Sequence, residues 1–448
     1  MEQKVTKMRR WYSVLSLGLV LSLVLSLVGC AHGMAVNQTG ESAKEEITYR
    51  LLEEAELSYE VPEALPGIRV AVAGYDNGEQ KEIHFSGEAL PEEFALVDAS
   101  NGVTVYRGGL SDISYNKESG IYSAIGDFTD YKIEGDFYVK APILGYSYTF
   151  PIMERGKMTF LENAYLTLET MAQTKEGVPE NEEAAILLLL SYELYENYIK
   201  EQEQDIPHIL QLATKYVDKC LAQRELLTEN DVKDDFQLAA LLAKYSYVYQ
   251  QYDKQRADEM IKLAATFWKQ ADSALAKDAL YPVENRMLAA AELYRATGGW
   301  SYRQIVEQIV KESNSKGTLL DNREDVLAAV TYVATKQRVS VDICTTLMKE
   351  IMKQAENVAA SAERTSSALG GVSDVAALDQ ILWNMVILCV VEYVITNYEY
   401  GNIIKNQYYF LLGRNARGYN YKDLDMAANP KWAAVDVMML YERIMNNH

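Results

Sequence analysis

The stretch FALVDASNGVTVY, at residues 94–106, decides the fold of the first part of the chain. Two runs of apolar and β-branched residues, Phe94–Val97 and Val103–Tyr106, flank the polar segment Asp98–Gly102. Such runs suit half-buried strands, and Asn-Gly accepts the positive φ angles that tight hairpins require. The pattern therefore predicts two antiparallel strands joined by a turn.

Similar short runs lie on both sides of this hairpin. Ile68–Val72 precedes it, and Gly135–Lys140 and Tyr146–Phe150 follow it. Several short strands separated by turn residues are typical of a β-sandwich. We therefore predict a small β-sandwich over residues 65–155.

From Met158 to the end of the chain the apolar residues recur at helical spacing, which predicts about twelve amphipathic helices. These helices are expected to begin near Met158, Glu180, Ile206, Asp231, Asp253, Tyr281, Ser301, Asn322, Val341, Asp374, Gly401 and Pro430. Wide apolar faces and short connections favour a closed ring of helical hairpins over residues 156–448. The same periodicity also permits a helical-repeat solenoid.

The first 29 residues have the order of an export signal. A basic start is followed by an apolar run from Trp11 to Val28, which ends in LVGC at Cys30. This ending resembles the lipobox of bacterial lipoproteins and implies that the Cys30 thiol is acylated after residues 1–29 are removed. Residues 30–64 are then a lipidated N-terminus and linker, on the outer face of a bacterial cytoplasmic membrane. The alternative is a transmembrane helix that stays in place.

Composition excludes several classes of function. A formal net charge of −21 makes nucleic acid an unfavourable partner. The cysteines beyond Cys30 are expected to be small core residues, although a disulfide between two of them stays open; they are Cys220, Cys344 and Cys389. The four histidines are widely scattered, so the sequence shows no histidine metal site or Ser/His triad.

Short segments in both halves share residues with one family. In the predicted sandwich they are 94–98 (FALVD), 102–108 (GVTVYRG), 126–129 (GDFT) and 135–138 (GDFY). In the helical part they are 206–210 (IPHIL), 289–298 (AAAELYRATG), 412–415 (LGRN) and 418–421 (GYNY). The chain resembles the family 9 glycoside hydrolases, the cellulase family. The resemblance implies an immunoglobulin-like sandwich followed by an (α/α)6 barrel of six hairpins, and β-glucan as the ligand.

The catalytic motifs of that family are missing. Inverting hydrolysis needs one carboxyl group to protonate the leaving oxygen and another to activate water. The family carries its base in an Asp-Ala-Gly-Asp loop between the first two barrel helices, but residues 172–183 read AQTKEGVPENEE. An alignment on Trp432 places Ala427 at the general acid, and the usual histidine-rich stretch after Gly-Arg-Asn is absent. The resemblance therefore implies a degenerate member.

Other carboxylates lie near both missing groups. Asp423 and Asp425 are close to the expected acid, and three glutamates, Glu180, Glu182 and Glu183, follow the shortened base loop. A relocated catalytic pair is conceivable. Acids after a proline are also typical of a helix N-terminus, and loop aspartates are usually solvated, so we favour these structural roles.

Four residues of the Gly-Arg-Asn region are candidates for a remnant cleft: Arg414, Asn415, Tyr419 and Tyr421. Tyrosine rings stack on sugar faces, although helical proteins also bury tyrosine in the core. No cofactor is expected; calcium is possible by family analogy, with no ligand that we can assign.

Three functions stay open on these grounds. The favoured one is a surface-anchored, non-catalytic protein that binds a polysaccharide or another envelope protein. The second is a divergent inverting β-glycan hydrolase, and the third is a purely structural envelope module.

Overall fold

The computed structural model describes residues 67–117, 119–154, 157–173, 178–203, 205–227, 234–278, 280–281, 283–363, 378–395, 399–415, 418–421 and 429–445. The predicted signal, Cys30 and the linker lie outside these residues. So do Asp423, Asp425 and Ala427, at the family's acid position.

The N-terminal part is a β-structure in which nine strands pair in the order β1-β3-β6-β5-β4-β7-β9-β2, with β8 on β7. The strands are β1 (Ile68–Arg69), β2 (Tyr75–Asp76), β3 (Glu82–Gly87), β4 (Glu93–Asp98), β5 (Thr104–Asn116), β6 (Ile121–Asp127), β7 (Gly135–Ala141), β8 (Gly145–Tyr146) and β9 (Phe150–Met153). Strand β5 pairs first with β4 and then with β6, so it links the two layers of a sandwich. The rings of Phe85 and Phe94 pack between them, with centroids 5.5 Å apart.

The predicted hairpin is confirmed as β4 and β5. The Asp98 N–H donates to the Val103 carbonyl at 2.9 Å, and Gly102 N–H donates to the Asp98 carbonyl at 2.8 Å. Only the glycine of the Asn-Gly pair has a positive φ, of 72°. Strands β3 and β6 lie outside the predicted runs, because EIHFSG and IYSAIGD interrupt the apolar alternation with polar residues and glycine.

Twelve helices follow within the described residues, close to the predicted starts. They are α2 (Lys157–Met171), α3 (Val178–Gln202), α4 (His208–Glu225), α5 (Asp235–Tyr249), α6 (Lys254–Lys277), α7 (Arg286–Thr297), α8 (Trp300–Lys316), α9 (Arg323–Ala334), α10 (Val341–Glu363), α11 (Leu378–Ile395), α12 (Gly401–Leu411) and α13 (Pro430–Met445). The predicted start of α11 at Asp374 lies outside the described residues.

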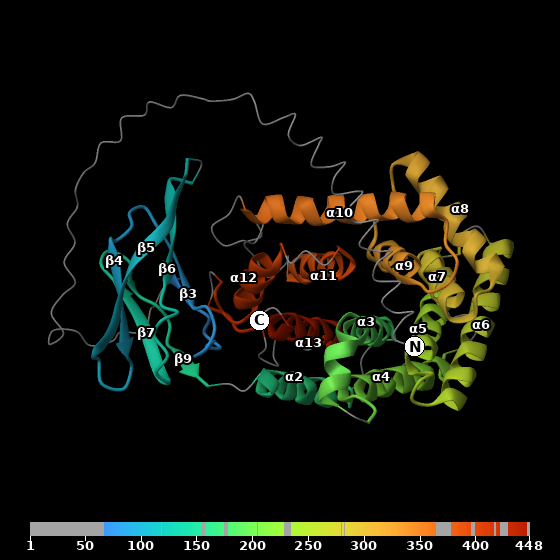
Figure 1. Cartoon of the computed structure of the whole chain (residues 1–448), viewed down its shortest axis with the longest axis horizontal. Coiled ribbons are helices and arrows are strands. Elements are labelled where there is room, and N and C mark those ends of the chain that lie inside the picture. The colour runs from blue at the N-terminus through green and yellow to red at the C-terminus, as the bar shows by residue number, and fades with distance from the viewer. Residues whose placement is uncertain are drawn as a thin grey trace, which may run out of the picture. The chain divides into compact units, whose positions relative to one another are not determined.

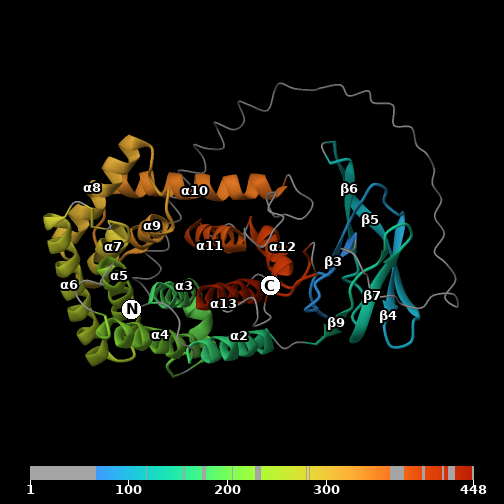
Figure 2. The ribbon, with the colours of Figure 1, turned by 180° about the vertical axis from the view of Figure 1, so that it is seen from behind.

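Outer and inner helices alternate along the chain, and the inner ones are buried on most sides. The inner helices are α3, α5, α7, α9, α11 and α13. Helix α13 packs on α3, which closes the ring, so the (α/α)6 barrel is confirmed and the solenoid alternative is wrong. The outer helices α4, α6, α8 and α10 lie at the periphery of the helical part in both views (Figures 1 and 2).

The ring has two distinct ends. Because outer and inner helices form antiparallel hairpins, the six inner helices all run in the same direction. We call the end where they begin the N-terminal mouth and the end where they finish the C-terminal mouth. Helix α11 is long and apolar enough to cross a membrane, but it lies in this inner ring and most of its residues are buried, as in the core helix of a globular domain.

The sandwich and the barrel meet at the end of α12. Ala73 N–H donates to the Leu412 carbonyl at 2.8 Å. Gly413 has a φ of 109°, and a Cβ there would lie 2.9 Å from the backbone nitrogen of Val72. Only glycine suits both the conformation and this close approach. The segment LGRN thus joins the two domains.

Candidate functional sites at the two mouths of the barrel

Ion pairs connect the first two turns of four inner helices at the N-terminal mouth. Lys431 Nζ of α13 lies 2.8 Å from Asp379 Oδ1 of α11 and 3.4 Å from Glu183 Oε2 of α3. Arg323 of α9 pairs with Asp379 and lies 4.0 Å from Glu183. Burial acts to raise the Asp379 pKa, but hydrogen bonds and ion pairs with Arg323 and Lys431 outweigh it and hold that pKa below its ordinary value. We call these four residues the N-mouth network.

A second acidic group lies beside this network. Glu182 is buried, which raises its pKa well above the ordinary value, and Asp234 and Asp235 raise it further. Burial also raises the pKa of Asp234 to about 6. Asp234 caps α5 by accepting a hydrogen bond from Gln237 N–H at 3.0 Å, and it accepts another from the Asn285 amide at 2.6 Å. These contacts are those of a helix cap.

The three glutamates near the shortened loop have separate environments. Glu180 is exposed in the first turn of α3, Glu182 points into the protein, and Glu183 is held in the N-mouth network. The predicted helix start is confirmed, since α3 begins at Val178. These residues do not form one cluster of free carboxylates.

Arg414 lies between the sandwich and the barrel. Its side chain is 1% exposed, and Nη1 lies 3.7 Å from Glu82 Oε2 of β3. Nη2 donates to the carbonyl and the side chain of Asn406, and the guanidinium lies 5.1 Å from the centre of the Tyr409 ring. The structure thus places this cleft candidate in the domain interface.

The other cleft candidates fold the connection after α12. The Asn415 amide donates to the Phe410 carbonyl at 2.9 Å and to the Tyr419 carbonyl at 2.7 Å, and its oxygen accepts from Tyr419 N–H at 3.0 Å. Tyr421 is mostly buried and stacks on Phe410, with ring centroids 5.8 Å apart. Asn415 therefore organises the local backbone.

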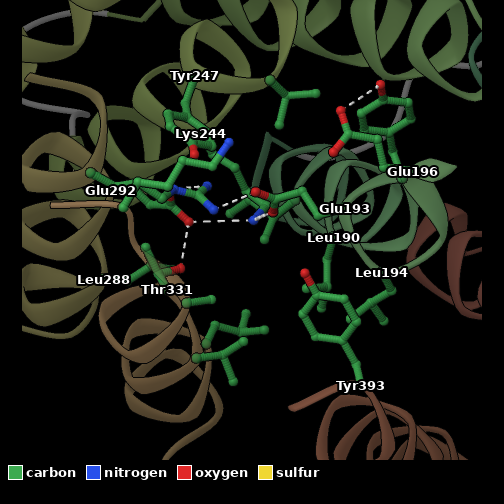
Figure 3. A pocket seen from close by; sticks show the side chains of 18 of the residues that line it. Leu190, Glu193, Leu194, Glu196, Lys244, Tyr247, Leu288, Glu292, Thr331 and Tyr393 are labelled. Carbon is green, nitrogen blue, oxygen red and sulfur yellow. Dashed lines mark hydrogen bonds and ion pairs between the residues drawn. The ribbon is translucent and has the colours of Figure 1, made fainter. Parts of the chain in front are cut away.

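Four charged residues, three of them buried and Glu193 partly buried, form a closed ring at the C-terminal mouth (Figure 3). Glu193 of α3 pairs with Lys244 of α5 and with Arg295 of α7. Glu292 of α7 completes the ring, with Oε1 3.4 Å from Lys244 Nζ and Oε2 paired with Arg295. The Thr331 hydroxyl of α9 donates to Glu292 at 2.8 Å. We call the four charged residues the C-mouth ring.

A cavity of about 370 Å³ opens beside the C-mouth ring. It is lined by side chains from five inner helices, among them Tyr247 and Tyr393, and by Gln251 from the turn after α5. Burial opposes ionisation of Glu193, but Arg295 and Lys244 outweigh it and keep the Glu193 pKa below its ordinary value. Glu193 therefore stays ionised near neutral pH and is a poor general acid.

A carboxyl pair joins α11 and α13 near the same end. Burial and a hydrogen bond with Glu442 raise the pKa of Glu392 to about 8. Glu442 accepts a hydrogen bond from the Tyr195 hydroxyl at 2.6 Å, and Glu392 accepts one from Tyr400 N–H at 2.7 Å. One proton is therefore held in this pair at neutral pH.

The raised pKa of Glu392 predicts that the stability of the protein depends on pH. The folded pKa of Glu392 lies above its ordinary value of 4.5, so its contribution is full below pH 4.5 and is lost as the pH rises through about 8. Between pH 6.5 and 9 we expect the free energy of unfolding to fall by about 1–3 kcal/mol more in the wild type than in Glu392→Gln. Urea denaturation at several pH values measures this, with exposed Glu201→Gln as the control. Parallel wild-type and Glu392→Gln curves would refute the assignment.

Comparison with known proteins gives matches in both domains. The model of the cellulase N-terminal ig-like domain matches residues 63–145, and the model of glycosyl hydrolase family 9 matches residues 233–422. The chain therefore resembles the family 9 glycoside hydrolases in both domains. No curated protein sequence matches it.

Solved structures of this family share the fold of the chain. A metagenome-derived family 9 endoglucanase has a TM-score of 0.62 at 16% identity, over 79% of this chain and 84% of that one. A thermostable endoglucanase from Alicyclobacillus acidocaldarius, a single mutant, has a TM-score of 0.61 at 16% identity, over 80% and 84%. The GH9 protein of Bacteroides ovatus has a TM-score of 0.62 at 14% identity, over 84% and 99%.

The catalytic groups of family 9 correspond to one end of the barrel. The base loop of family 9 lies between the first two barrel helices, and its general acid lies just before the last helix, so both belong to the N-terminal mouth. The N-mouth network of this chain, formed by Glu183 and its partners, lies at that end. The C-mouth ring lies at the opposite end. Among the described residues no group of three or more His, Cys, Asp or Glu is placed to hold a metal ion.

Proposed function

We propose that this family 9 relative is a lipid-anchored protein that binds polysaccharide without hydrolysing it. The observation that carries the proposal is the pairing of Glu183 with Lys431 and Arg323 at the mouth where the family performs catalysis. A carboxylate held by two cations is an anchor for those cations. It is poorly suited to activating a water molecule.

The neighbouring acids Glu182 and Asp234 are not placed as the second catalytic carboxyl group. Inverting hydrolysis places two carboxyl groups about 6.5–9.5 Å apart, on either side of the scissile bond, with room for a water. Glu182 is buried below the surface of the mouth, and Asp234 is engaged as a helix cap. These environments support a protein that has lost hydrolysis.

The N-terminal mouth still has groups that suit a neutral, hydroxyl-rich polymer. Its charges alternate in sign, and the side chains of Lys431, Glu183 and Asp379 are 18%, 29% and 41% exposed. Charged groups of both signs donate to and accept from sugar hydroxyls while the site favours neither anions nor cations. The similar solved structures include AaCel9A in complex with a cellobiose-like isofagomine, which supports β-glucan as the first ligand to test.

Retention in a polyacrylamide gel that contains mixed-linkage β-glucan tests the binding. We expect the wild type to migrate more slowly than in a plain gel, and Lys431→Met to lose at least half of this retardation. Lys353→Met is the matched control, because Lys353 is 64% exposed on the outer helix α10. Equal migration of the wild type in both gels would contradict glucan binding and favour a structural envelope module.

A divergent hydrolase is the second candidate. Asp423 or Asp425 would act as the acid, and Asp234, whose pKa burial raises to about 6, would leave its helix-capping contacts to act as the base. If this candidate is right, the wild type releases reducing ends from the glucan. At least one of the substitutions Asp423→Asn, Asp425→Asn and Asp234→Asn then abolishes this release.

The proposed anchor is the lipid on Cys30, which rests on the LVGC sequence. Membrane fractions of cells that express the wild type should hold the protein, labelled by radioactive palmitate. Cys30→Ser should lose the label, and Cys344→Ser should keep it. Persistence of the label in Cys30→Ser would contradict lipidation at this residue.

A further inference from the structure

We propose that the C-terminal mouth is a binding pocket for a small, neutral, hydroxyl-rich ligand of the size of a mono- or disaccharide. The pocket lies at the opposite end of the barrel from the N-mouth network, so the inference does not depend on the proposed function. Its volume of about 370 Å³ is within the range of about 300–1,000 Å³ that small-molecule sites occupy.

The first argument is that burying the charged side chains of the C-mouth ring costs free energy. The side chains of Lys244, Glu292 and Arg295 are 4%, 1% and 6% exposed, on inner helices whose other residues are largely apolar. Replacing a buried ion network by apolar residues of similar volume is often neutral or stabilising. Three buried charges and a partly buried one, Glu193, beside an open cavity therefore indicate a site that uses them.

The second argument is the balance of charge. The cavity is lined by three carboxylates, from Glu193, Glu196 and Glu292, and by three cations, from Lys244, Arg295 and Lys336. A balanced lining gives no net attraction for an ion. It does offer strong donors and acceptors to hydroxyl groups, which can donate to a carboxylate and accept from an ammonium or guanidinium group.

The third argument comes from the aromatic lining. Tyr393 lies on α11, and its hydroxyl points into the cavity toward Glu193 (Figure 3). The residue is 45% exposed. Tyr247 lies on the other side, with the Arg295 guanidinium 4.3 Å from its ring centre. Exposed tyrosine faces suit the C–H face of a sugar ring.

A fourth observation is an unused donor on the C-mouth ring. Arg295 is 6% exposed and lines the cavity, yet its Nε has no hydrogen-bond partner within the described part of the chain. An orphaned buried donor is uncommon in native proteins. A hydroxyl of a ligand in the cavity would supply an acceptor for it.

Isothermal titration calorimetry on the full chain, purified in mild detergent, tests the pocket. The probes are glucose, cellobiose and maltose, with citrate as an anion and spermidine as a cation. We expect saturable binding of at least one neutral sugar and none of the two ions. Tyr393→Ala should raise the Kd about tenfold, whereas Tyr115→Ala, a tyrosine of similar exposure at 49% in the sandwich, should leave it unchanged.

A second variant guards against misfolding. Ala334 is exposed and lines the cavity, so Ala334→Trp should fill it without disturbing the core and should abolish binding. Lys353→Met should keep it, because Lys353 is exposed on the outer helix α10 and lines neither mouth. Absence of sugar binding by the wild type, binding of the ions alone, or binding that survives Ala334→Trp would overturn the proposal.

Discussion

Replacement of Arg295 by methionine is expected to lower the free energy of unfolding by about 3–5 kcal/mol, because one partner is removed from a buried ion network. Arg295 pairs with Glu193 and Glu292 of the C-mouth ring. Methionine fills a similar space but leaves these two carboxylates with only Lys244 as a counterion. The loss is then mainly the free energy of a buried, uncompensated charge.

Urea denaturation at pH 7 measures this effect against two further variants. Arg338→Met is the control, because Arg338 is exposed on the connection after α9 and should cost less than about 0.5 kcal/mol. The double variant Arg295→Met with Glu193→Gln should recover part of the loss, because it also removes one unpaired charge. A cost for Arg295→Met no larger than that of Arg338→Met would show that the C-mouth ring is not a tightly coupled network.

Replacement of Arg414 by alanine is expected to lower stability by about 2–4 kcal/mol and to separate the unfolding of the two domains. Its side chain bridges Glu82 of the sandwich to Asn406 of α12 and covers the Tyr409 ring. Alanine removes these contacts and leaves a cavity between the domains.

Differential scanning calorimetry distinguishes this role from a surface effect. We expect one main transition for the wild type and two for Arg414→Ala, with limited proteolysis between β9 and α2 becoming faster. Arg107→Ala is the control, because Arg107 is exposed on β5. An Arg414→Ala thermogram that superimposes on the wild type would contradict a role at the interface.

Much of the fold follows from local patterns in the sequence. The hairpin at residues 94–106 and the helical period after Met158 are short-range signals, and both are confirmed. The sequence permits both a closed ring and a solenoid. Closure of the ring depends on the packing of α13 against α3, and these helices are far apart in the chain. Strands β3 and β6 lack a clear alternation and are held by pairing with each other.

The sites are harder to predict from the sequence, because the residues that form them are also far apart in the chain. Arg414 stands in a family-like motif, but its partner Glu82 lies on β3, which the sequence pattern does not indicate. The C-mouth ring did leave a signal: Lys244 interrupts the apolar run LAALLAKYSYVY, and Glu292 and Arg295 interrupt MLAAAELYRATG. A single charge within an apolar helix marks a buried partner, and only the fold shows where that partner lies.

Release of reducing ends from mixed-linkage β-glucan is the measurement that tests the central claim most directly. The purified full chain would be incubated for many hours beside an active family 9 endoglucanase, and binding to the same glucan would be measured in parallel. The account predicts retention on the glucan without release above a protein-free blank. Release that scales with the concentration of the protein and disappears in Asp423→Asn, Asp425→Asn or Asp234→Asn would contradict it and identify a relocated catalytic acid.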